Sequence, residues 1–340
     1  MRSVVIKDVK EFEIKDIEEP KKENGKVTIE VIKSGICGSD IHYWESGSPS
    51  GLVMGHEFSG NIIDASDSEF NVGDRVTALP ISPCGKCSAC LVGNVQYCPE
   101  TWTYGIGLSM DNPGGLTSKI NVRSDMVLKL PDNVSYEEGA MVEPTAVSLH
   151  AIHLADIKVG AKVLIIGGGI IGLGCAMFAK LEGAGFVALS ETNERRGKKA
   201  VELDVADCWY DAKDQNSIAE MLTKTGDGFD VVVECVGNSP AVNSALTLVK
   251  PGGTVVLVGV STTAIDTYTT IAVMKELKVL GAIAYTKEEF KTCIELISNK
   301  QIDVSKFISK EVGLNEVQSA YQELTSGNTD SIKILVDPSK

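Results

Sequence analysis

From Lys162 onward the chain alternates short apolar runs with helix-length segments, and this alternation constrains the fold more than any other feature. The first runs indicate a strand (KVLIIG), a helix (IIGLGCAMFAKLEGA), a second strand (FVALSE) and a second helix (ERRGKKAVEL). Further apolar strands are expected in DVVVECVG, GGTVVLVGV and KVLGAIA. Apolar strands that are separated by helices are typical of a parallel sheet covered on both faces. The sequence therefore predicts an α/β, doubly wound domain here.

The first of these strands runs into the motif G-x-G-x-x-G, at Gly167, Gly169 and Gly172. The motif marks a dinucleotide site when it closes a strand and opens a helix, as it does here. The glycines permit a tight turn, close approach of a pyrophosphate and close packing of helix on strand. The helix N-terminus at Ile170 and Ile171 offers free N–H groups to negative charge. We predict that these five residues bind the cofactor. The alternative is a glycine turn without a nucleotide.

The second strand ends at Glu191, roughly 20 residues after the motif, where an acid accepts the ribose hydroxyls of a dinucleotide. A carboxylate at this position repels a 2′-phosphate, so NAD is favoured over NADP. Arg195 and Arg196 follow closely and keep NADP possible. We expect Arg196 to contact the cofactor.

Four cysteines cluster in the loop 84–98, at Cys84, Cys87, Cys90 and Cys98. The surrounding segment 81–115 lacks hydrophobic periodicity and is expected to be irregular. Short CxxC spacings supply the four thiolates that a structural zinc ion prefers, whereas a thioredoxin-like redox pair would need one CxxC that opens a helix. We predict a structural zinc site. Four protein ligands leave no position for a substrate, so the chemistry must lie elsewhere.

Two other stretches could form an open metal site, SGICGSDIHYW at 34–44 and GHEFSG at 55–60. They contain Cys37, His56 and Glu57, which together offer a sulfur, a nitrogen and a carboxylate to a catalytic zinc ion. From spacing alone, a buried core cysteine and a surface histidine remain the alternatives.

Composition narrows the function classes. A chain of 340 residues predicts two domains, and 43% apolar with 23% charged residues is typical of a globular protein. The net charge of −14 disfavours binding to nucleic acids and anionic membranes. No apolar run reaches the roughly 18 residues of a transmembrane helix. The N-terminus alternates apolar and charged residues, so we expect no signal peptide, a cytoplasmic location and nine reduced cysteines.

The ordered motifs GICGSDIHYW, GHEFSG, the CxxCxxCx7C loop, VEPTAVSLHA and VLIIGGGIIGLG resemble those of the zinc-dependent medium-chain dehydrogenases over essentially the whole chain. The chain is most similar to the polyol branch, which includes sorbitol, xylitol, threonine, butanediol and galactitol-phosphate dehydrogenases. The resemblance implies a GroES-like β-barrel catalytic domain from residues 1–150 and 285–340, and an inserted Rossmann domain at 151–284. It also implies a homodimer or homotetramer.

The resemblance implies roles for the residues of the open metal site. Cys37 and His56 would bind the catalytic zinc ion, and Glu143 occupies the position of the third protein ligand. Glu57 would be either a direct ligand or a carboxylate that exchanges with water, so which glutamate binds zinc stays open. Asp40 matches the acid that orients the histidine ligand.

The resemblance also implies a reaction. Zinc would lower the pKa of a secondary alcohol of a polyol or sugar-alcohol derivative, the alcohol would become a ketone, and NAD would accept the hydride. The proton would leave through Ser39, the cofactor ribose and His42. Tyr43 matches an aromatic residue beside the substrate.

Alternative functions stay open. A phosphorylated polyol would require cations near the substrate, and Lys119, Arg123 and Lys287 are candidates. An amino alcohol such as threonine and a diol are further candidate substrates. An NAD-binding sensor on the same scaffold is the non-enzymatic alternative.

Two departures weaken the assignment of sorbitol as the substrate. Sorbitol dehydrogenases carry an Arg-Tyr pair that binds substrate hydroxyls, and Ala284-Tyr285 stands at the matching place. The loop between Trp44 and Gly55 is also shortened.

The remaining histidines and cysteines are expected to pack in the interior. We expect His150 to pack and His153 to be partly buried on its helix. The core thiols are expected at Cys175, Cys208, Cys235 and Cys293.

Overall fold

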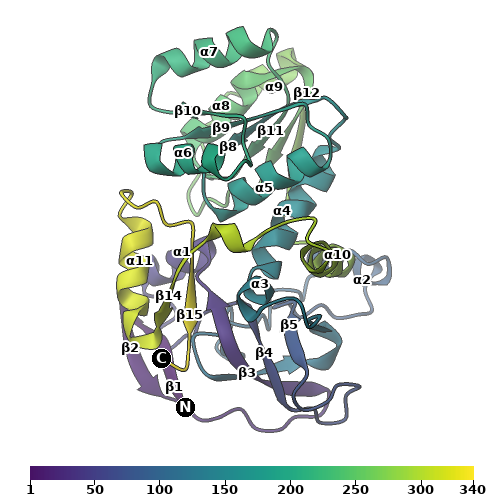
Figure 1. Cartoon of the computed structure of the whole chain (residues 1–340), viewed down its shortest axis with the longest axis vertical. Coiled ribbons are helices and arrows are strands. Elements are labelled where there is room, and N and C mark those ends of the chain that lie inside the picture. The colour runs from purple at the N-terminus through teal and green to yellow at the C-terminus, as the bar shows by residue number, and fades with distance from the viewer. The chain divides into compact units, whose positions relative to one another are not determined.

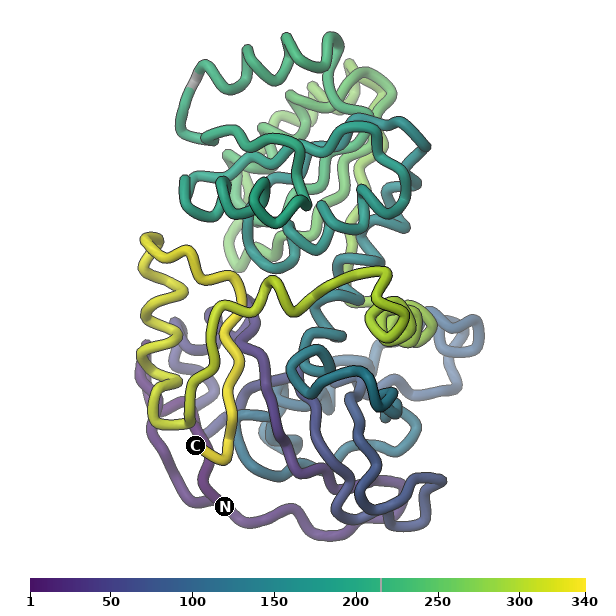
Figure 2. Tube along the Cα trace, in the orientation of Figure 1, coloured from purple at the N-terminus to yellow at the C-terminus, as the bar shows by residue number. Residues whose placement is uncertain are grey.

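The computed structural model describes residues 1–340 apart from the side chain of Gln215 (Figure 2). The chain forms two compact units. Unit 1 comprises Met1–Ala146, Tyr285–Gly327 and Lys333–Lys340, and unit 2 comprises Val147–Ala284 and Asn328–Ile332. The short segment Asn328–Ile332 therefore packs with unit 2, although the chain on both sides of it belongs to unit 1.

Unit 1 is built on a mainly antiparallel sheet with the strand order β14-β15-β3-β4-β5-β7, and β6 pairs with β3 as well. The C-terminal strand β15 lies beside β3 from the N-terminal half, so the two ends of the sequence share one sheet (Figure 1). The strands are β3 (Lys26–Gly35), β4 (Glu57–Asp64), β5 (Arg75–Ala78), β6 (Lys119–Arg123), β7 (Val127–Lys129), β14 (Ile308–Gly313) and β15 (Lys333–Asp337).

A β-hairpin and several helices complete unit 1. The hairpin is β1 (Arg2–Asp8) and β2 (Glu11–Asp16), and the helices are α1 (Gly38–Ser46), α2 (Ser88–Leu91), α3 (Tyr136–Ala140), the start of α4 (Val142–Ala155), α10 (Lys287–Ser298) and α11 (Val317–Thr325). One core cluster joins residues of α1, α11 and β15, and its largest members are Trp44 and Tyr321. Their rings lie 5.7 Å apart.

Unit 2 is a parallel sheet with the order β10-β9-β8-β11-β12-β13, which is the doubly wound topology that the alternating sequence predicts. Its strands are β8 (Lys162–Ile166), β9 (Phe186–Glu191), β10 (Cys208–Asp211), β11 (Phe229–Glu234), β12 (Val249–Leu257) and β13 (Lys278–Gly281). Its helices are α5 (Ile170–Leu181), α6 (Glu194–Glu202), α7 (Gln215–Thr225), α8 (Ser239–Leu248) and α9 (Thr269–Met274). The strand order reverses between β8 and β11, where folds of this class bind their ligands.

The segment 136–157, whose first part belongs to unit 1 and whose last part belongs to unit 2, differs from its prediction in one detail. The sequence indicates helical spacing from Tyr136 to Ile157, but the structure breaks it at Met141 into α3 and α4. A capping box between Ser135 and Glu138 begins α3.

The remaining histidines and cysteines were expected to pack in the interior, and only some of them do. Cys175 and Cys293 are fully buried, which confirms them as core thiols. Cys208 and Cys235 are only half-buried. His153 is exposed rather than partly buried, because it lies on the outward side of α4.

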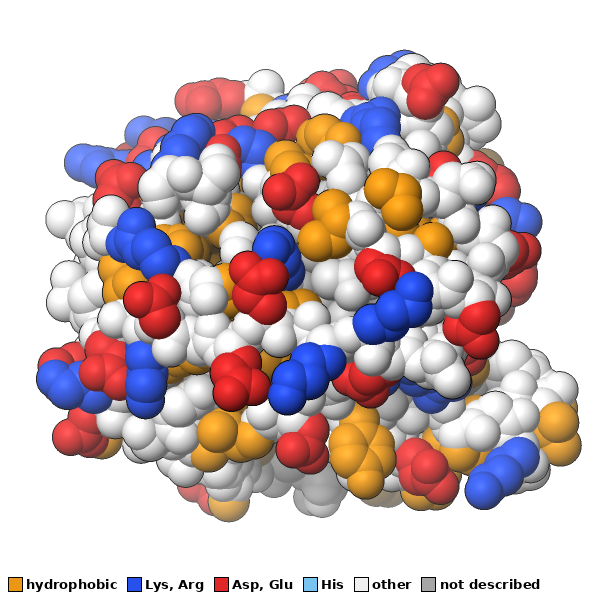
Figure 3. All heavy atoms as spheres, turned by 90° about the horizontal axis from the view of Figure 1, so that it is seen from below, with side chains coloured by type: hydrophobic (Ala, Val, Ile, Leu, Met, Phe, Trp, Pro, Cys, Tyr) orange, Lys and Arg blue, Asp and Glu red, His pale blue; other side chains and the backbone are white. Residues whose placement is uncertain are grey.

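The surface carries both signs of charge. On the face shown in Figure 3, acidic and basic side chains alternate with apolar ones, despite the net charge of −14. No helix in the described part of the chain is long and apolar enough to cross a membrane.

Candidate active site

The structure brings Cys37, His56 and Glu57 together in unit 1. Each offers one ligand atom, and these atoms all lie within 4.8 Å of one another. Cys37 is the N-cap residue of α1, two residues after the end of β3, and Glu57 is the first residue of β4. Because β3 and β4 pair in an antiparallel register that sets Gly35 opposite Glu57, the two stretches that supply the ligands meet at one end of the sheet. A sulfur, an imidazole and a carboxylate at this spacing fit a zinc ion.

Asp40 lies behind His56. Its Oδ1 is 3.2 Å from Nδ1 of His56, and its side chain is fully buried in the first turn of α1. Burial lowers the pKa of His56, but the Asp40 carboxylate and the Cys37 sulfur raise that pKa more strongly, to well above the usual value. A carboxylate beside Nδ1 favours the ring orientation in which Nε2 is available to a metal ion.

Glu57 also forms a buried ion pair that the sequence analysis missed. Nζ of Lys333 lies 2.8 and 2.6 Å from the two carboxylate oxygens of Glu57 and donates to the Ile36 carbonyl at 2.9 Å. Both side chains are fully buried. Burial lowers the pKa of Lys333, but Glu57 raises it further, so the pKa lies above its ordinary value. A lysine within the apolar run IKILV was the available signal, because a buried charge needs a partner.

The sheet order explains how this pair forms. Glu57 lies on β4 and Lys333 on β15, and these strands flank β3 on opposite sides. A Cβ atom at Gly35 of β3 would overlap Oε2 of Glu57, so the glycine provides the space in which the two side chains meet.

Glu143 lies in the first turn of α4 and is buried. The Tyr285 hydroxyl donates to its Oε1 at 2.8 Å. Burial raises the pKa of Glu143 to about 7, against the opposing effect of His56. Among the described residues, the group of mutually close ligand atoms contains Glu57 but not Glu143. Tyr285 itself is fully buried, so it does not present its ring to solvent.

The predicted proton path starts on α1. The Ser39 hydroxyl donates to Cys37 Sγ at 3.3 Å, and His42, three residues later on the same helix, is exposed. Residues three apart share a helix face. Tyr43 is half-buried and packs against the core of unit 1, so only part of its ring is accessible.

The cysteine loop forms a second group. The four sulfurs of Cys84, Cys87, Cys90 and Cys98 lie within 4.8 Å of one another. The backbone N–H groups of Cys84 and Glu100 donate to Cys98 Sγ and lower the pKa of that thiol to about 6. Burial raises the pKa of Cys90 to about 12. Four sulfurs at this spacing, with amide donors on one of them, fit a structural zinc ion.

In unit 2 the glycine motif has the geometry of a dinucleotide loop. Gly167 has a φ of 105°, which favours glycine, and a Cβ atom at Gly172 would overlap the Gly167 carbonyl oxygen. Gly169 is the N-cap of α5, whose first residues are Ile170 and Ile171, and nothing lies within 4 Å of a Cβ built on it. The loop thus leaves room for a pyrophosphate above the helix N-terminus.

Known proteins similar to this chain include zinc-binding and alcohol dehydrogenases. Two family models match, "Zinc-binding dehydrogenase" over residues 171–299 and "Alcohol dehydrogenase GroES-like domain" over residues 23–132. A 2-dehydro-3-deoxy-L-galactonate 5-dehydrogenase of Pseudoalteromonas atlantica is 35% identical over 92% of this chain and 92% of its own. Sorbitol dehydrogenase of Bacillus subtilis is 29% identical over 100% of this chain and 98% of its own. The crystal structure of 2R,3R-butanediol dehydrogenase from Bacillus subtilis matches with a TM-score of 0.88 and 30% identity over 99% of both chains.

The chain belongs to the zinc-dependent medium-chain dehydrogenases. It is therefore an oxidoreductase that acts on a CH–OH group of a small molecule, with zinc and a nicotinamide dinucleotide as cofactors. The predicted family, fold class and cofactors are confirmed.

Within this dehydrogenase, Glu191 has more partners than the sequence suggested. Its Oε2 accepts the N–H of Gly168 at 2.6 Å, and its Oε1 accepts those of Thr192 and Asn193 at 2.6 and 2.8 Å. Glu191, the last residue of β9, therefore also holds the glycine loop in place. Arg196, on α6, donates from Nη2 to the Ser331 carbonyl at 3.1 Å.

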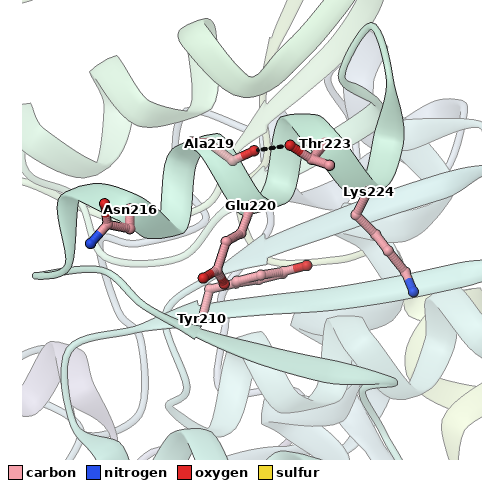
Figure 4. Close-up of a pocket in the computed structure, with 6 residues that line it drawn as sticks. All are labelled: Tyr210, Asn216, Ala219, Glu220, Thr223 and Lys224. Atoms are coloured by element: carbon pink, nitrogen blue, oxygen red, sulfur yellow. Dashed lines mark hydrogen bonds between the residues drawn. The ribbon is translucent and has the colours of Figure 1, made fainter.

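A hollow of about 510 Å³ in the dehydrogenase's unit 2 contains none of the predicted site residues. Tyr210 and Glu220 approach each other beneath α7, and Lys224 points away from them (Figure 4). Burial raises the pKa of Tyr210 to about 12, and Cys208 adds to the shift. Neither the residues of the two metal-ligand groups nor those of the glycine motif line this hollow, so we do not assign the active site to it.

Proposed function

We propose that this dehydrogenase oxidises a secondary alcohol of an unphosphorylated polyol or sugar-alcohol derivative to a ketone, with NAD as the preferred hydride acceptor. The observation that carries the proposal is the group of Cys37, His56 and Glu57, backed by Asp40 on one side and Lys333 on the other. When bound there, zinc lowers the pKa of the substrate hydroxyl, and the nicotinamide takes the hydride.

The third protein ligand is assigned to Glu57 in this proposal. The Glu57 carboxylate lies close to the ligand atoms of Cys37 and His56. Lys333 neutralises the charge of this carboxylate but leaves oxygen lone pairs of Glu57 free to bind a metal ion. Glu143 then lies beside Cys37, His56 and Glu57, which we call the metal group, and the Tyr285 hydroxyl holds its carboxyl group. The pKa of Glu143, about 7, lets this carboxyl group exchange a proton near neutral pH.

Ser39 and His42 carry the proton in this proposal. The Ser39 hydroxyl lies on the sulfur of Cys37, within the metal group, and can accept a proton from a substrate hydroxyl there. His42 is exposed on the same helix and can release the proton to water.

An unphosphorylated substrate is favoured because the three candidate cations already have partners. Lys119 lies 2.7 Å from Glu19, Arg123 lies 2.6 Å from Asp125, and Lys287 donates to the Asp125 carbonyl at 2.6 Å. A phosphate would have to compete with these contacts. The relatives named sorbitol and butanediol dehydrogenase support an alcohol with vicinal hydroxyls.

The test is reduction of NAD or NADP by the purified, zinc-loaded protein across a panel of alcohols. The panel contains free polyols, their monophosphates, short diols, sugar acids and threonine. We expect turnover of a free polyol or diol with NAD. Turnover restricted to a monophosphate, a sugar acid or threonine would contradict the substrate class, and absence of turnover with the whole panel would contradict the proposal.

We also propose that the protein is a homodimer or homotetramer that associates through unit 2. In the described part of the sheet, β13 pairs only with β12, so its outer edge is open. Exposed apolar side chains lie on β13, just after it and on the preceding helix α9, at Tyr268, Val273, Met274, Val279 and Ile283. An open strand edge with apolar neighbours favours pairing with a second copy.

A further inference from the structure

The segment Asn328–Ile332, which we call the strap, is bound to the loop that follows β9. The Thr329 carbonyl accepts a hydrogen bond from Asn193 Nδ2 at 2.9 Å, and the Ser331 carbonyl accepts one from Arg196 Nη2 at 3.1 Å. Thr329 and Ser331 are both buried. Within the strap, the Ser331 N–H donates to Thr329 Oγ1 at 3.0 Å, which fixes the turn that presents these carbonyls.

Arg196 and Glu191 flank the same point of the glycine loop. A Cβ atom built on Gly168 would lie 2.9 Å from Glu191 Oε2 and 3.5 Å from Arg196 Cβ. The acid expected to bind the ribose and the arginine that could bind a 2′-phosphate are therefore neighbours. Glu191 is fixed there by backbone N–H groups, and Arg196 is fixed by the strap.

A phosphate is recognised best when an arginine offers two parallel N–H groups to it. Arg196 already gives Nη2 to Ser331, and its Nε is buried without a hydrogen-bond partner in the described structure. The adjacent Nε and Nη2 donors therefore cannot both face a 2′-phosphate unless the guanidinium leaves Ser331 or the strap moves. A cofactor without the 2′-phosphate makes no such demand.

We propose that the strap holds Arg196 away from a 2′-phosphate, and that the strap and Glu191 together set the preference for NAD. This inference rests on the proposed use of NAD. It makes Asn193 and Thr329 positioning residues that act through Arg196. It also predicts that removal of Glu191 alone leaves most of the discrimination in place.

Two conservative substitutions loosen the strap. Asn193→Ser removes the Nδ2 donor to Thr329 but keeps a side-chain oxygen for the N-cap of α6, which Asn193 Oδ1 supplies now. Thr329→Val removes the hydroxyl that accepts the Ser331 N–H. Thr325→Val is the matched control, because the Thr325 hydroxyl bonds to the Tyr321 carbonyl within α11, outside the strap.

The experiment measures the dissociation constants of NADH and NADPH by nicotinamide fluorescence, without any alcohol. Glu191→Ala alone should strengthen NADPH binding by less than about fivefold, and adding Asn193→Ser with Thr329→Val should strengthen it about tenfold more. Adding Thr325→Val instead should change it by less than about twofold. Introducing Arg196→Met into the loosened protein should abolish the gain.

Three results would overturn the inference. One is that the full gain arises with Glu191→Ala alone. The second is that the loosened strap adds no more than the Thr325→Val control. The third is that the gain survives Arg196→Met. If the parent protein binds NADPH more tightly than NADH, the proposed use of NAD is wrong as well. If the parent protein binds NADH more tightly and one of these three results is found, only the proposed role of the strap is wrong.

Discussion

At the scale of single residues, Lys333 neutralises the charge of Glu57 in the metal group. Its Nζ bonds both oxygens of Glu57 in an environment without solvent. Removing one partner of a buried ion pair leaves an uncompensated charge, which costs far more than loss of an exposed pair.

We therefore expect Lys333→Met to lower the free energy of unfolding of the metal-free protein by about 3–5 kcal/mol. The matched control is Lys119→Met, which removes the partly exposed pair with Glu19 and should cost less than about 1 kcal/mol. Urea unfolding of the two variants measures the difference. Equal losses would show that the pair with Glu57 is no stronger than a surface pair.

Glu143 gives a prediction for pH. Its pKa rises from 4.5 to about 7 on folding because the group is buried. The folded state therefore holds the proton more tightly than the unfolded chain. The resulting stabilisation is complete below the unfolded pKa and is lost as the pH rises through about 7.

The metal-free protein should thus lose stability from this group between about pH 4.5 and 7, by about 3 kcal/mol at most. Glu143→Gln should flatten that part of the profile, because the amide does not titrate. Thermal unfolding of both proteins across this range, with a chelator present, measures the effect. Identical slopes would contradict the assignment of this pKa.

The residues at the site were predictable to different degrees. Cys37, His56 and Asp40 stand in two short stretches whose residue types suggest metal binding. Lys333 and Tyr285 come more than two hundred positions later in the chain than these stretches. Strand order brings Lys333 to Glu57, and the placement of α4 brings Glu143 to Tyr285. No local pattern contains that information, although a lysine in an apolar strand signals that a partner exists.

At the scale of elements, β3 is the strand on which the metal group depends. It supplies Gly35 opposite Glu57, leads into Cys37 and separates β4 from β15. Short β-like runs in KVTIEVIKSG, HEFSGNIID and IKILVD indicate the three strands individually. Their order could not be derived from the sequence, because β15 joins the sheet from the far end of the chain.

The parallel sheet was easier to predict because its inner strands are buried on both faces and form continuous apolar runs. The edge strand β10, with the sequence CWYD, was missed. All of its residues are half-buried, so it has no such run. The break between α3 and α4 was missed too, since helical spacing continues across Met141.

The cysteine loop yields a prediction at this scale. Cys87→Ser should reduce the zinc content from two ions per chain to one and lower the thermal stability of unit 1, because metal binding orders a loop with little regular structure. The control is Cys208→Ser, a half-buried thiol outside both metal groups. Zinc analysis and thermal unfolding measure the outcome. Two ions per chain in Cys87→Ser would refute the structural site.

At the scale of the whole molecule, composition indicates two domains, and the net charge of −14 disfavours binding to nucleic acids and anionic membranes. Composition does not indicate that Asn328–Ile332 packs with unit 2 between two segments of unit 1. That excursion is too short to carry a pattern of its own.

Oligomeric state can be tested on the same scale. Val273 and Met274 are 74% and 79% exposed on α9, the helix that precedes β13 in the chain. We expect Val273→Asp with Met274→Asp to convert the oligomer to monomers, since burial of charge at an apolar contact is unfavourable. Val72→Asp, at a valine of unit 1 that is 68% exposed, should leave the mass unchanged. Light scattering after gel filtration measures it, and an unchanged oligomer in the double variant would contradict association through this face.

In the proposed function, catalysis depends on zinc held by Cys37 and His56. The most direct measurement compares the parent protein with Cys37→Ser after both are stripped of metal and titrated with zinc, recording bound zinc and NADH formation together. We predict that the parent binds two ions per chain and is active only when both are bound, whereas Cys37→Ser keeps its fold, binds one and forms no NADH. NADH formation by Cys37→Ser at the parent's rate would contradict the account.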